Sequence, residues 1–173
     1  DFISLKYVDY SNEIVNGADT AFLENTTKDG REVVMCTPNT KRTSTGKTIS
    51  LDGYKYAGAS IDLNAYRWFA IEYYYQAPNP KNINMRVDVM TNGAVLTKSV
   101  GANSTEPLVA NTWAIALFDM SVLEGNVNPD NPTPNMKQMH IRAYGLDSLP
   151  ILDETDIMFV SRVMFFKDKP DFR

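Results

Sequence analysis

Cysteine and histidine are almost absent from this sequence. A single cysteine, Cys36, excludes an internal disulfide and a thiolate metal cluster. The single histidine, His140, excludes a histidine-rich zinc site and leaves little material for a Ser/His/Asp triad. Because Val33, Val34 and Met35 precede Cys36, we expect its thiol to be buried on a strand.

Long apolar runs and a strong charge of one sign are also missing. No run of about 18 apolar residues occurs, so we expect no insertion into a membrane. The 17 basic and 21 acidic residues give a net charge of −4, which argues against a nucleic-acid partner. No signal sequence opens the chain, which begins at Asp1, as expected for a processed protein or an excised module.

The composition is typical of one soluble globular domain over residues 1–173, with 43% hydrophobic and 22% charged residues. Turns are predicted at Asp29-Gly30, Asp52-Gly53 and Asn92-Gly93, and residues 9–30 are interpreted as a mostly polar connection. The predicted strands are 2–8, 31–37, 48–51, 54–57, 60–63, 66–76, 83–90, 94–100, 112–119, 136–144 and 156–167. With no sustained helical period, this pattern predicts an all-β antiparallel sandwich or barrel.

The aromatic segment 66–76 has two alternating rows of side chains. One row is apolar and is expected to face the core: Phe69, Ile71, Tyr73 and Tyr75. The other row contains Trp68, Glu72 and Tyr74. If segments 83–90 and 136–144 share its sheet, the opposite face collects the candidate binding residues Trp68, Glu72, Tyr74, Arg86, Asp88, His140 and Arg142.

Sugar recognition needs such a mixture, because a flat ring stacks on the apolar face of a pyranose while charged groups bind its hydroxyls. Trp113 is expected in the core-facing row of its strand, and Ala114 and Ala116 would leave room on the open face. The alternative is an ordinary polar sheet face, stabilised modestly by cross-strand ion pairs and without a ligand.

Three segments together resemble the strands of β-jelly-roll carbohydrate-binding modules of secreted bacterial proteins. They are residues 113–121, 139–145 and 155–167, and the resemblance covers roughly residues 60–170. It implies a two-sheet jelly roll. It also implies a polysaccharide partner, neighbouring domains in a parent chain, a secreted or cell-surface location, and a structural calcium ion in some members, with no other cofactor.

Two motifs imitate known sites. Ser44–Thr48 is similar to the end of a phosphate-binding loop, but Lys41 stands where that motif needs glycine, and strand residues follow. Oxygen-bearing side chains alternate as in a calcium loop at Glu124, Asn126, Asn128 and Asp130. Pro129 occupies the place of the required glycine turn, so a solvated loop is the better interpretation, with an irregular calcium site as the alternative.

The leading hypothesis from sequence is therefore a non-catalytic polysaccharide-binding module of a larger secreted or surface protein. The alternative is a structural or adhesin-type protein-interaction domain with no sugar site. A third possibility is a polysaccharide lyase or hydrolase, which needs acid and base groups that converge in a cleft. The sequence shows no G-x-S-x-G nucleophile motif.

Overall fold

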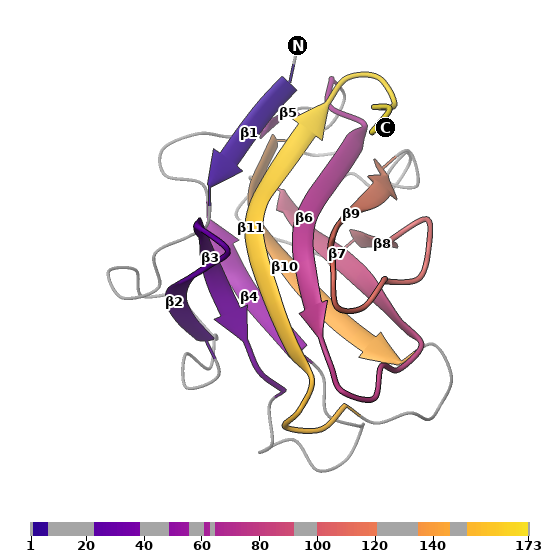
Figure 1. Ribbon diagram of the computed structural model, residues 1–173. Coiled ribbons are helices and arrows are strands. Elements are labelled where there is room, and N and C mark those ends of the chain that lie inside the picture. Colours follow the sequence, from indigo (N-terminus) through magenta and orange to yellow (C-terminus); the bar gives the residue numbers. More distant parts are fainter. Residues whose placement is uncertain are drawn as a thin grey trace.

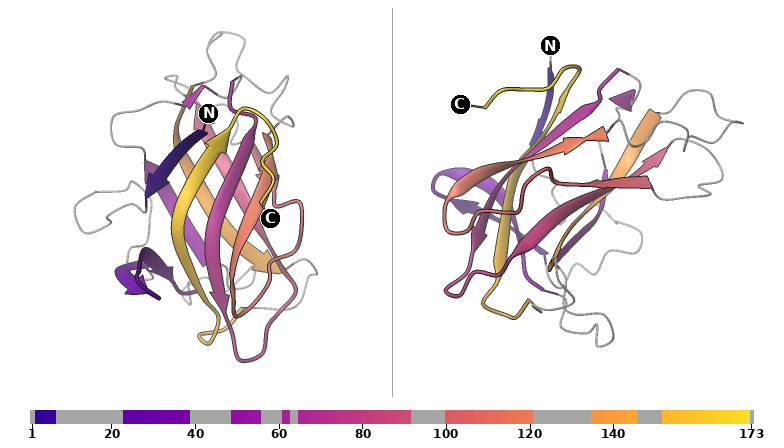
Figure 2. Two further views of the ribbon diagram at one scale, coloured as in Figure 1. Left: turned by 45° about the horizontal axis from the view of Figure 1, so that its top comes forward. Right: turned by 90° about the vertical axis from the view of Figure 1, so that its right-hand side faces the viewer.

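The computed structural model describes residues 2–6, 23–38, 49–55, 61–62, 65–91, 100–120, 135–145 and 152–172. Within these ranges the chain forms eleven β-strands, arranged in two antiparallel sheets that pack face to face (Figures 1 and 2). The predicted all-β, antiparallel two-sheet sandwich is confirmed. The Asn92-Gly93 turn, the Ser44–Thr48 motif and the possible calcium loop lie outside the described residues.

Sheet A has the strand order β2-β3-β11-β6-β9, with β1 also paired to β11, and sheet B has the order β4-β10-β7-β8, with β5 also paired to β10. The strands of sheet A are β1 (Phe2–Lys6), β2 (Leu23–Lys28), β3 (Arg31–Cys36), β6 (Trp68–Gln76), β9 (Trp113–Asp119) and β11 (Ile157–Phe166). The strands of sheet B are β4 (Ile49–Lys55), β5 (Ile61–Asp62), β7 (Ile83–Thr91), β8 (Val100–Asn103) and β10 (Asn135–Gly145). In the described part of the chain, no helix is long and apolar enough to cross a membrane.

The core lies between the two sheets and uses the rows that alternation predicts. The side chains of Phe69, Ile71, Tyr73 and Tyr75 on β6 are at most 1% exposed. From sheet B they are met by buried residues that include Met85, Val87, Ile141 and Ala143. Cys36 is also buried, as expected, and this burial raises the pKa of its thiol far above the ordinary value.

The predicted orientation of β9 is wrong. We expected Trp113 to face the core and Ala114 and Ala116 to lie on the open face. Instead Ala116 is buried in the core, and Trp113 is half-buried on the outer face of sheet A. Ala114 and Ala116 pair with Tyr73 and Ile71, whose large side chains leave room only for small partners in a close-packed interior.

The assumption that segments 66–76, 83–90 and 136–144 share one sheet is also wrong. β6 belongs to sheet A, whereas β7 and β10 belong to sheet B. The chain changes sheets between Gln76 and Ile83, through a connection that contains Pro78 and Pro80. Neither proline has an N–H to donate to a strand ladder, so the pairing of β6 cannot continue into β7 through this connection.

β2 occupies residues that we interpreted as a polar connection. It pairs with β3 through a two-residue turn, in which Asp29 has a φ of 52° and Gly30 a φ of 77°. Positive φ at both positions is the requirement of the hairpin turn that Asp-Gly predicts, so the predicted turn is confirmed. The strand itself was missed because its sequence, Leu-Glu-Asn-Thr-Thr-Lys, lacks an apolar alternation.

A second Asp-Gly pair behaves differently. Asp52 and Gly53 lie inside β4, where we predicted a turn between two strands. The register passes from Leu51 opposite Ile141 to Tyr54 opposite Met139, so two residues of β4 face one residue of β10. Glycine inside a strand commonly marks such a β-bulge, and here it takes the place of the predicted turn.

The segment between β8 and β9 covers the edge of sheet A. Thr105 N–H donates to Leu117 O at 2.8 Å, and Asn111 N–H donates to Tyr75 O at 2.6 Å. The Asn111 side chain also bonds both backbone groups of Ala77, at 3.0 and 2.9 Å. With a φ of 59°, Asn111 bends the chain there, and its amide substitutes for a strand at an otherwise open edge.

Candidate functional site

Three aromatic side chains lie side by side on the outer face of sheet A. Trp113 on β9, Tyr74 on β6 and Phe159 on β11 are successive register partners across three strands. The Tyr74 ring meets the Trp113 ring edge to face at 5.6 Å and the Phe159 ring at 6.3 Å. Phe159 is 8% exposed, whereas Tyr74 and Trp113 are half-buried, so parts of their rings reach solvent.

The turn of the β2–β3 hairpin brings two cations onto these rings. Lys28 Nζ lies 4.2 Å from the Tyr74 ring centroid and 5.0 Å from that of Phe159. The Arg31 guanidinium lies 4.1 Å from the Trp113 ring centroid. All three distances are within the range of cation–π attraction, which is worth about 0.5–1 kcal/mol at an exposed site. The hairpin is therefore held against the outer face of sheet A.

Hydrogen bonds fix the polar groups around the rings. Trp113 Nε1 donates to Asp29 Oδ2 at 3.0 Å, and Arg31 Nη1 lies 3.3 Å from Glu72 Oε1. The Ser161 hydroxyl donates to the same Glu72 oxygen at 2.6 Å. The side chains of Asp29 and Arg31 are 59% and 42% exposed, so both remain open to a ligand. The hairpin–ring cluster is defined as Lys28, Asp29, Arg31, Glu72, Tyr74, Trp113 and Phe159.

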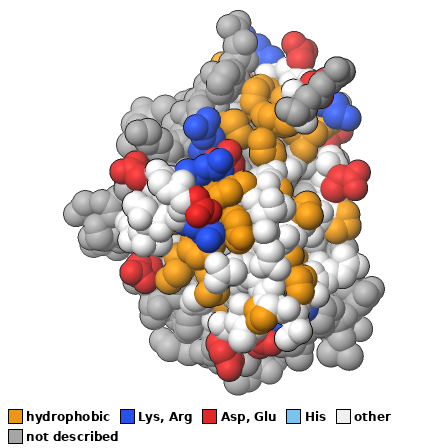
Figure 3. Space-filling view, viewed as in Figure 1, with side chains coloured by type: hydrophobic (Ala, Val, Ile, Leu, Met, Phe, Trp, Pro, Cys, Tyr) orange, Lys and Arg blue, Asp and Glu red, His pale blue; other side chains and the backbone are white. Residues whose placement is uncertain are grey.

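Trp68 lies on the same outer face at the other end of β6. It is half-buried, and Lys169 Nζ from the C-terminal segment lies 5.5 Å from its ring centroid. Trp68 and Tyr74 are six residues apart, which corresponds to about 20 Å along a strand. Figure 3 views this face and shows hydrophobic side chains interspersed with charged ones.

The seven residues proposed from sequence divide between the two sheets. Glu72 and Tyr74 belong to the hairpin–ring cluster, and Trp68 shares their face. The other four lie in sheet B, where the backbone register sets Arg86 opposite Arg142 and Asp88 opposite His140. Of these four side chains, only Arg86 lies within the described set, and it is half-buried. The structure therefore separates a single predicted site into two groups.

Sequence reasoning missed five members of the cluster. Trp113 was expected in the core, and Lys28, Asp29, Arg31 and Phe159 were not considered as binding residues. Lys28 and Arg31 flank a recognised Asp-Gly turn, and β-hairpin residues next to such a turn lie opposite each other. This spacing indicates that the two cations lie together on one hairpin, and it was the signal in the sequence that could have identified them. Nothing in the local sequence shows that the hairpin lies over Tyr74 and Trp113.

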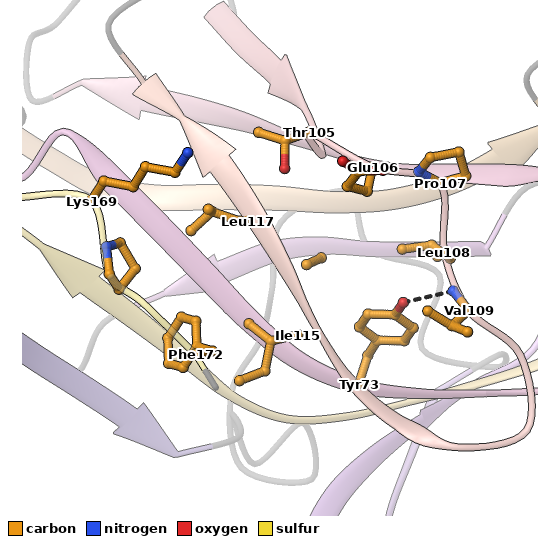
Figure 4. A pocket seen from close by; sticks show the side chains of 12 residues that line it. Tyr73, Thr105, Glu106, Pro107, Leu108, Val109, Ile115, Leu117, Lys169 and Phe172 are labelled. Carbon is orange, nitrogen blue, oxygen red and sulfur yellow. Dashed lines mark hydrogen bonds between the residues drawn. The ribbon is translucent and has the colours of Figure 1, made fainter.

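A cleft of about 420 Å³ opens at the β9 edge of the sandwich. One wall is the segment after β8, another is β9 itself, and the third is the C-terminal segment (Figure 4). Its side chains are mostly apolar, and two of them, Val109 and Phe172, are 54% and 44% exposed. The Tyr73 hydroxyl accepts a hydrogen bond from Val109 N–H at 2.9 Å inside this cleft.

A separate polar cluster ties the β6–β7 connection to the turn before β11. The fully buried Asp156 carboxylate accepts hydrogen bonds from the Tyr75 hydroxyl at 2.6 Å, from Asp153 N–H at 2.8 Å, and from the Lys81 ammonium. Burial and the neighbouring carboxylates raise the pKa of Tyr75. Burial alone would lower the pKa of Lys81, but its bonds to Asp156 and Asp153 outweigh this and raise it. Within the described residues, no group of three or more His, Cys, Asp or Glu side chains could hold a metal ion.

Acid should weaken this cluster through Asp153. The Thr155 hydroxyl and N–H donate to the Asp153 carboxylate, and Lys81 Nζ lies 3.2 Å away, so the pKa of Asp153 is lowered from 3.8 to about 2. The folded chain binds a proton at Asp153 more weakly than the unfolded chain does. The stabilisation that the ionised Asp153 carboxylate gives is therefore complete above about pH 4 and disappears as the pH falls towards about 2. We expect the melting temperature of the parent to fall more steeply across that window than that of Asp153→Asn. Parallel curves would contradict the assignment.

No protein-family profile and no curated protein matches the sequence. Among solved structures, the chain is similar to a low-affinity xylan-binding module, CBM86, from the gut symbiont Roseburia intestinalis, with 10% identity and a TM-score of 0.46 over 97% of this chain and 96% of that one. It is similar to TmCBM27, a mannan-recognising carbohydrate-binding module, with 13% identity and a TM-score of 0.45 over 96% of this chain and 89% of that one. A family 43 arabinoxylan arabinofuranohydrolase from Bacillus subtilis aligns with 12% identity and a TM-score of 0.35 over 83% of this chain and 23% of that one. Similarities at this level assign no ligand or activity to the chain.

Proposed function

We propose that this chain is a non-catalytic polysaccharide-binding module whose ligand lies along the outer face of sheet A. The observation that carries the proposal is the hairpin–ring cluster, in which the half-buried Trp113 and Tyr74 rings lie beside the exposed Arg31 and Asp29 side chains. Rings offer apolar surface to the C–H face of a sugar, and charged groups offer directed hydrogen bonds to its hydroxyls.

The polar groups of the cluster are suited to binding because they are already positioned. Glu72 is held by Arg31 and by the Ser161 hydroxyl, so it presents fixed acceptor atoms instead of a mobile acid. Trp113 is oriented by its bond to Asp29. A site whose groups are ordered before the ligand arrives has less conformational entropy to lose on binding.

Trp68 extends the proposed site along β6, about 20 Å from Tyr74. A ligand that contacts both rings must be a chain and not a single sugar, which favours a polysaccharide. Arg86, Asp88, His140 and Arg142 belong to sheet B and are not included in this site. We further propose that the module belongs to a secreted or surface protein, where neighbouring modules add avidity to a modest affinity.

Replacing Trp113 with alanine should weaken polysaccharide binding by about tenfold or more, because a central aromatic truncation commonly costs at least about 1.4 kcal/mol of binding free energy. Affinity gel electrophoresis against xylan, mannan, β-glucan and starch identifies the ligand class, and calorimetry with the best ligand gives the affinity of each variant. Glu154→Ala, an exposed change in the turn before β11, is the control and should bind like the parent. Equal affinity of Trp113→Ala and the parent, with both folded, would remove the hairpin–ring cluster from the site.

Trp68→Ala measures the extent of the site independently. We expect a smaller loss than for Trp113→Ala, because Trp68 lies about 20 Å from the hairpin–ring cluster and contacts only one end of a long ligand. Short oligosaccharides should bind this variant and the parent with equal affinity, whereas long chains should bind the variant more weakly. Unchanged binding of long chains would remove Trp68 from the site and restrict the ligand to the hairpin end.

A protein-interaction domain is the second candidate. It is favoured by the exposed apolar side chains of Val109 and Phe172, which line one cleft at the β9 edge. If no polysaccharide in the panel binds the parent, the proposed function is wrong and this candidate takes its place.

A further inference from the structure

The β9-edge cleft adjoins the proposed polysaccharide site. Lys169 lines the cleft, and its Nζ also lies 5.5 Å from the Trp68 ring centroid on the outer face of sheet A. Figure 4 shows Lys169 and Phe172 at one end of the cleft and Tyr73 and Val109 at the other. The Tyr73 end of the cleft lies next to the hairpin–ring cluster, because Tyr73 pairs with Ala114 and Tyr74 with Trp113. A chain that runs from Trp68 to Trp113 therefore passes both ends of the cleft and can direct a substituent over the β9 edge to the Tyr73 end.

The Tyr73 hydroxyl is a buried hydrogen-bond donor at the far end of this cleft. The side chain is 1% exposed, and its oxygen accepts the Val109 N–H at 2.9 Å. In the described part of the chain, the structure shows no acceptor for the hydroxyl proton. Burial raises the pKa of Tyr73, although the bond from Val109 partly offsets this, so the hydroxyl keeps its proton at neutral pH. A ligand acceptor that reaches this end of the cleft would meet this proton.

The surroundings of this hydroxyl are apolar. Leu108, Ile115 and Ala116 line the cleft, and Figure 4 shows the Leu108, Val109 and Ile115 side chains around the Tyr73 ring. An unmodified sugar would place several hydroxyls against these aliphatic walls without partners, which is costly. A group with one acceptor and an apolar remainder fits better, because the acceptor meets the Tyr73 hydroxyl and the remainder meets the walls.

We propose that the Tyr73 end of the cleft binds an acetyl group carried by the polysaccharide. The ester carbonyl accepts the Tyr73 hydroxyl proton, and the methyl group packs against Leu108 and Ile115. This inference rests on the proposed function, since the same chain lies over the outer face of sheet A. It makes the module selective for acetylated over unmodified polysaccharide.

Calorimetric titration of the parent tests the selectivity. The probes are acetylated xylan and acetylated mannan, each beside its own alkali-treated form, which has lost the esters. We expect one acetylated probe to bind about tenfold more tightly than its treated form. Equal affinities overturn this inference and leave the proposed function in place. The same result is expected if the cleft docks a protein instead of an acetyl group. Binding of none of the polysaccharides, here or in the panel above, overturns both.

Two variants locate the selectivity in the cleft. Tyr73→Phe removes the donor and should lower the affinity for the acetylated probe about fivefold, a typical effect of one hydrogen bond, while the treated form binds as before. Because this change also removes the acceptor of Val109 N–H, Val109→Trp provides an independent test: it adds bulk at a 54% exposed position and should block the cleft. Val109→Ala is its control and should keep the selectivity. Full selectivity in both Tyr73→Phe and Val109→Trp would overturn the inference, whereas Trp113→Ala should weaken binding of both probe forms equally.

Discussion

Replacing Asp156 with alanine is expected to lower the free energy of unfolding by about 3–5 kcal/mol, the usual cost of removing one partner from a buried ion pair. The Asp156 carboxylate is completely buried and accepts hydrogen bonds from Tyr75, Lys81 and Asp153. Without it, the Lys81 ammonium, whose side chain is 13% exposed, keeps the partly exposed Asp153 as its one counter-charge among the described residues. The Tyr75 hydroxyl also loses its acceptor inside the protein.

Urea denaturation at neutral pH measures this loss. Glu154→Ala is the matched control, because it removes a carboxylate from the same turn at an exposed position and should change stability by no more than about 0.5 kcal/mol. A loss below about 1 kcal/mol in Asp156→Ala would show that solvent or another group replaces the carboxylate, and the cluster would then not hold the two connections together.

Phe165→Ala should destabilise the sandwich by about 3–5 kcal/mol, the range measured for large aromatic truncations in protein cores. Phe165 is fully buried on β11, directly opposite Phe69 on β6, and the two rings meet edge to face at a centroid distance of 4.5 Å. Truncation leaves a cavity between the two sheets and removes the ring contact. Neighbouring core side chains are packed from both sheets, so they can fill the cavity only partly.

Phe172→Ala is the matched comparison for this prediction. Its ring is 44% exposed and contacts Phe166 at 5.6 Å, so we expect a loss of no more than about 1 kcal/mol. Thermal and urea unfolding of both variants should give clearly different midpoints. Equal losses at the two positions would mean that the region around Phe165 is not the tightly packed core described above.

The fold class could be predicted because it depends on local patterns. Short alternating segments, and a resemblance to jelly-roll carbohydrate-binding modules, predicted the two-sheet antiparallel sandwich that the structure has. Alternation also identified the core row of β6, since its other row contains a glutamate. In β9 both rows are apolar, and the larger one was assigned to the core. The structure reverses this, because the space opposite Tyr73 and Ile71 accepts only Ala114 and Ala116.

The assignment of strands to sheets could not be predicted, because it depends on pairs that are distant in sequence. Trp68 pairs with Phe166 and Tyr74 with Phe159, across most of the second half of the chain. Local pattern does not show that β6 joins β11 instead of its neighbour β7. For the same reason the sequence placed Trp68, Glu72 and Tyr74 beside residues that belong to the other sheet.

Two of the seven cluster residues lie on the ring-rich strand β6, and three lie on the β2–β3 hairpin, whose first strand was not predicted. Tyr74 and Glu72 were selected because rings and carboxylates alternate on β6. Arg31 and Asp29 reach them only because β2 pairs with β3 and the turn lies against the rings. A polar strand such as β2 takes its conformation from its partner, so propensity alone does not reveal it.

The position of β11 determines when this protein can fold during its synthesis. β11 pairs with β1, β3 and β6, yet it is the last of the described strands to leave the ribosome. The strands of sheet B are all translated earlier, so that sheet can form on the nascent chain while the Phe69 and Ile71 row still lacks its neighbour. Until β11 emerges, one edge of β6 lacks its partner, and we expect the nascent chain to be prone to aggregation at this stage.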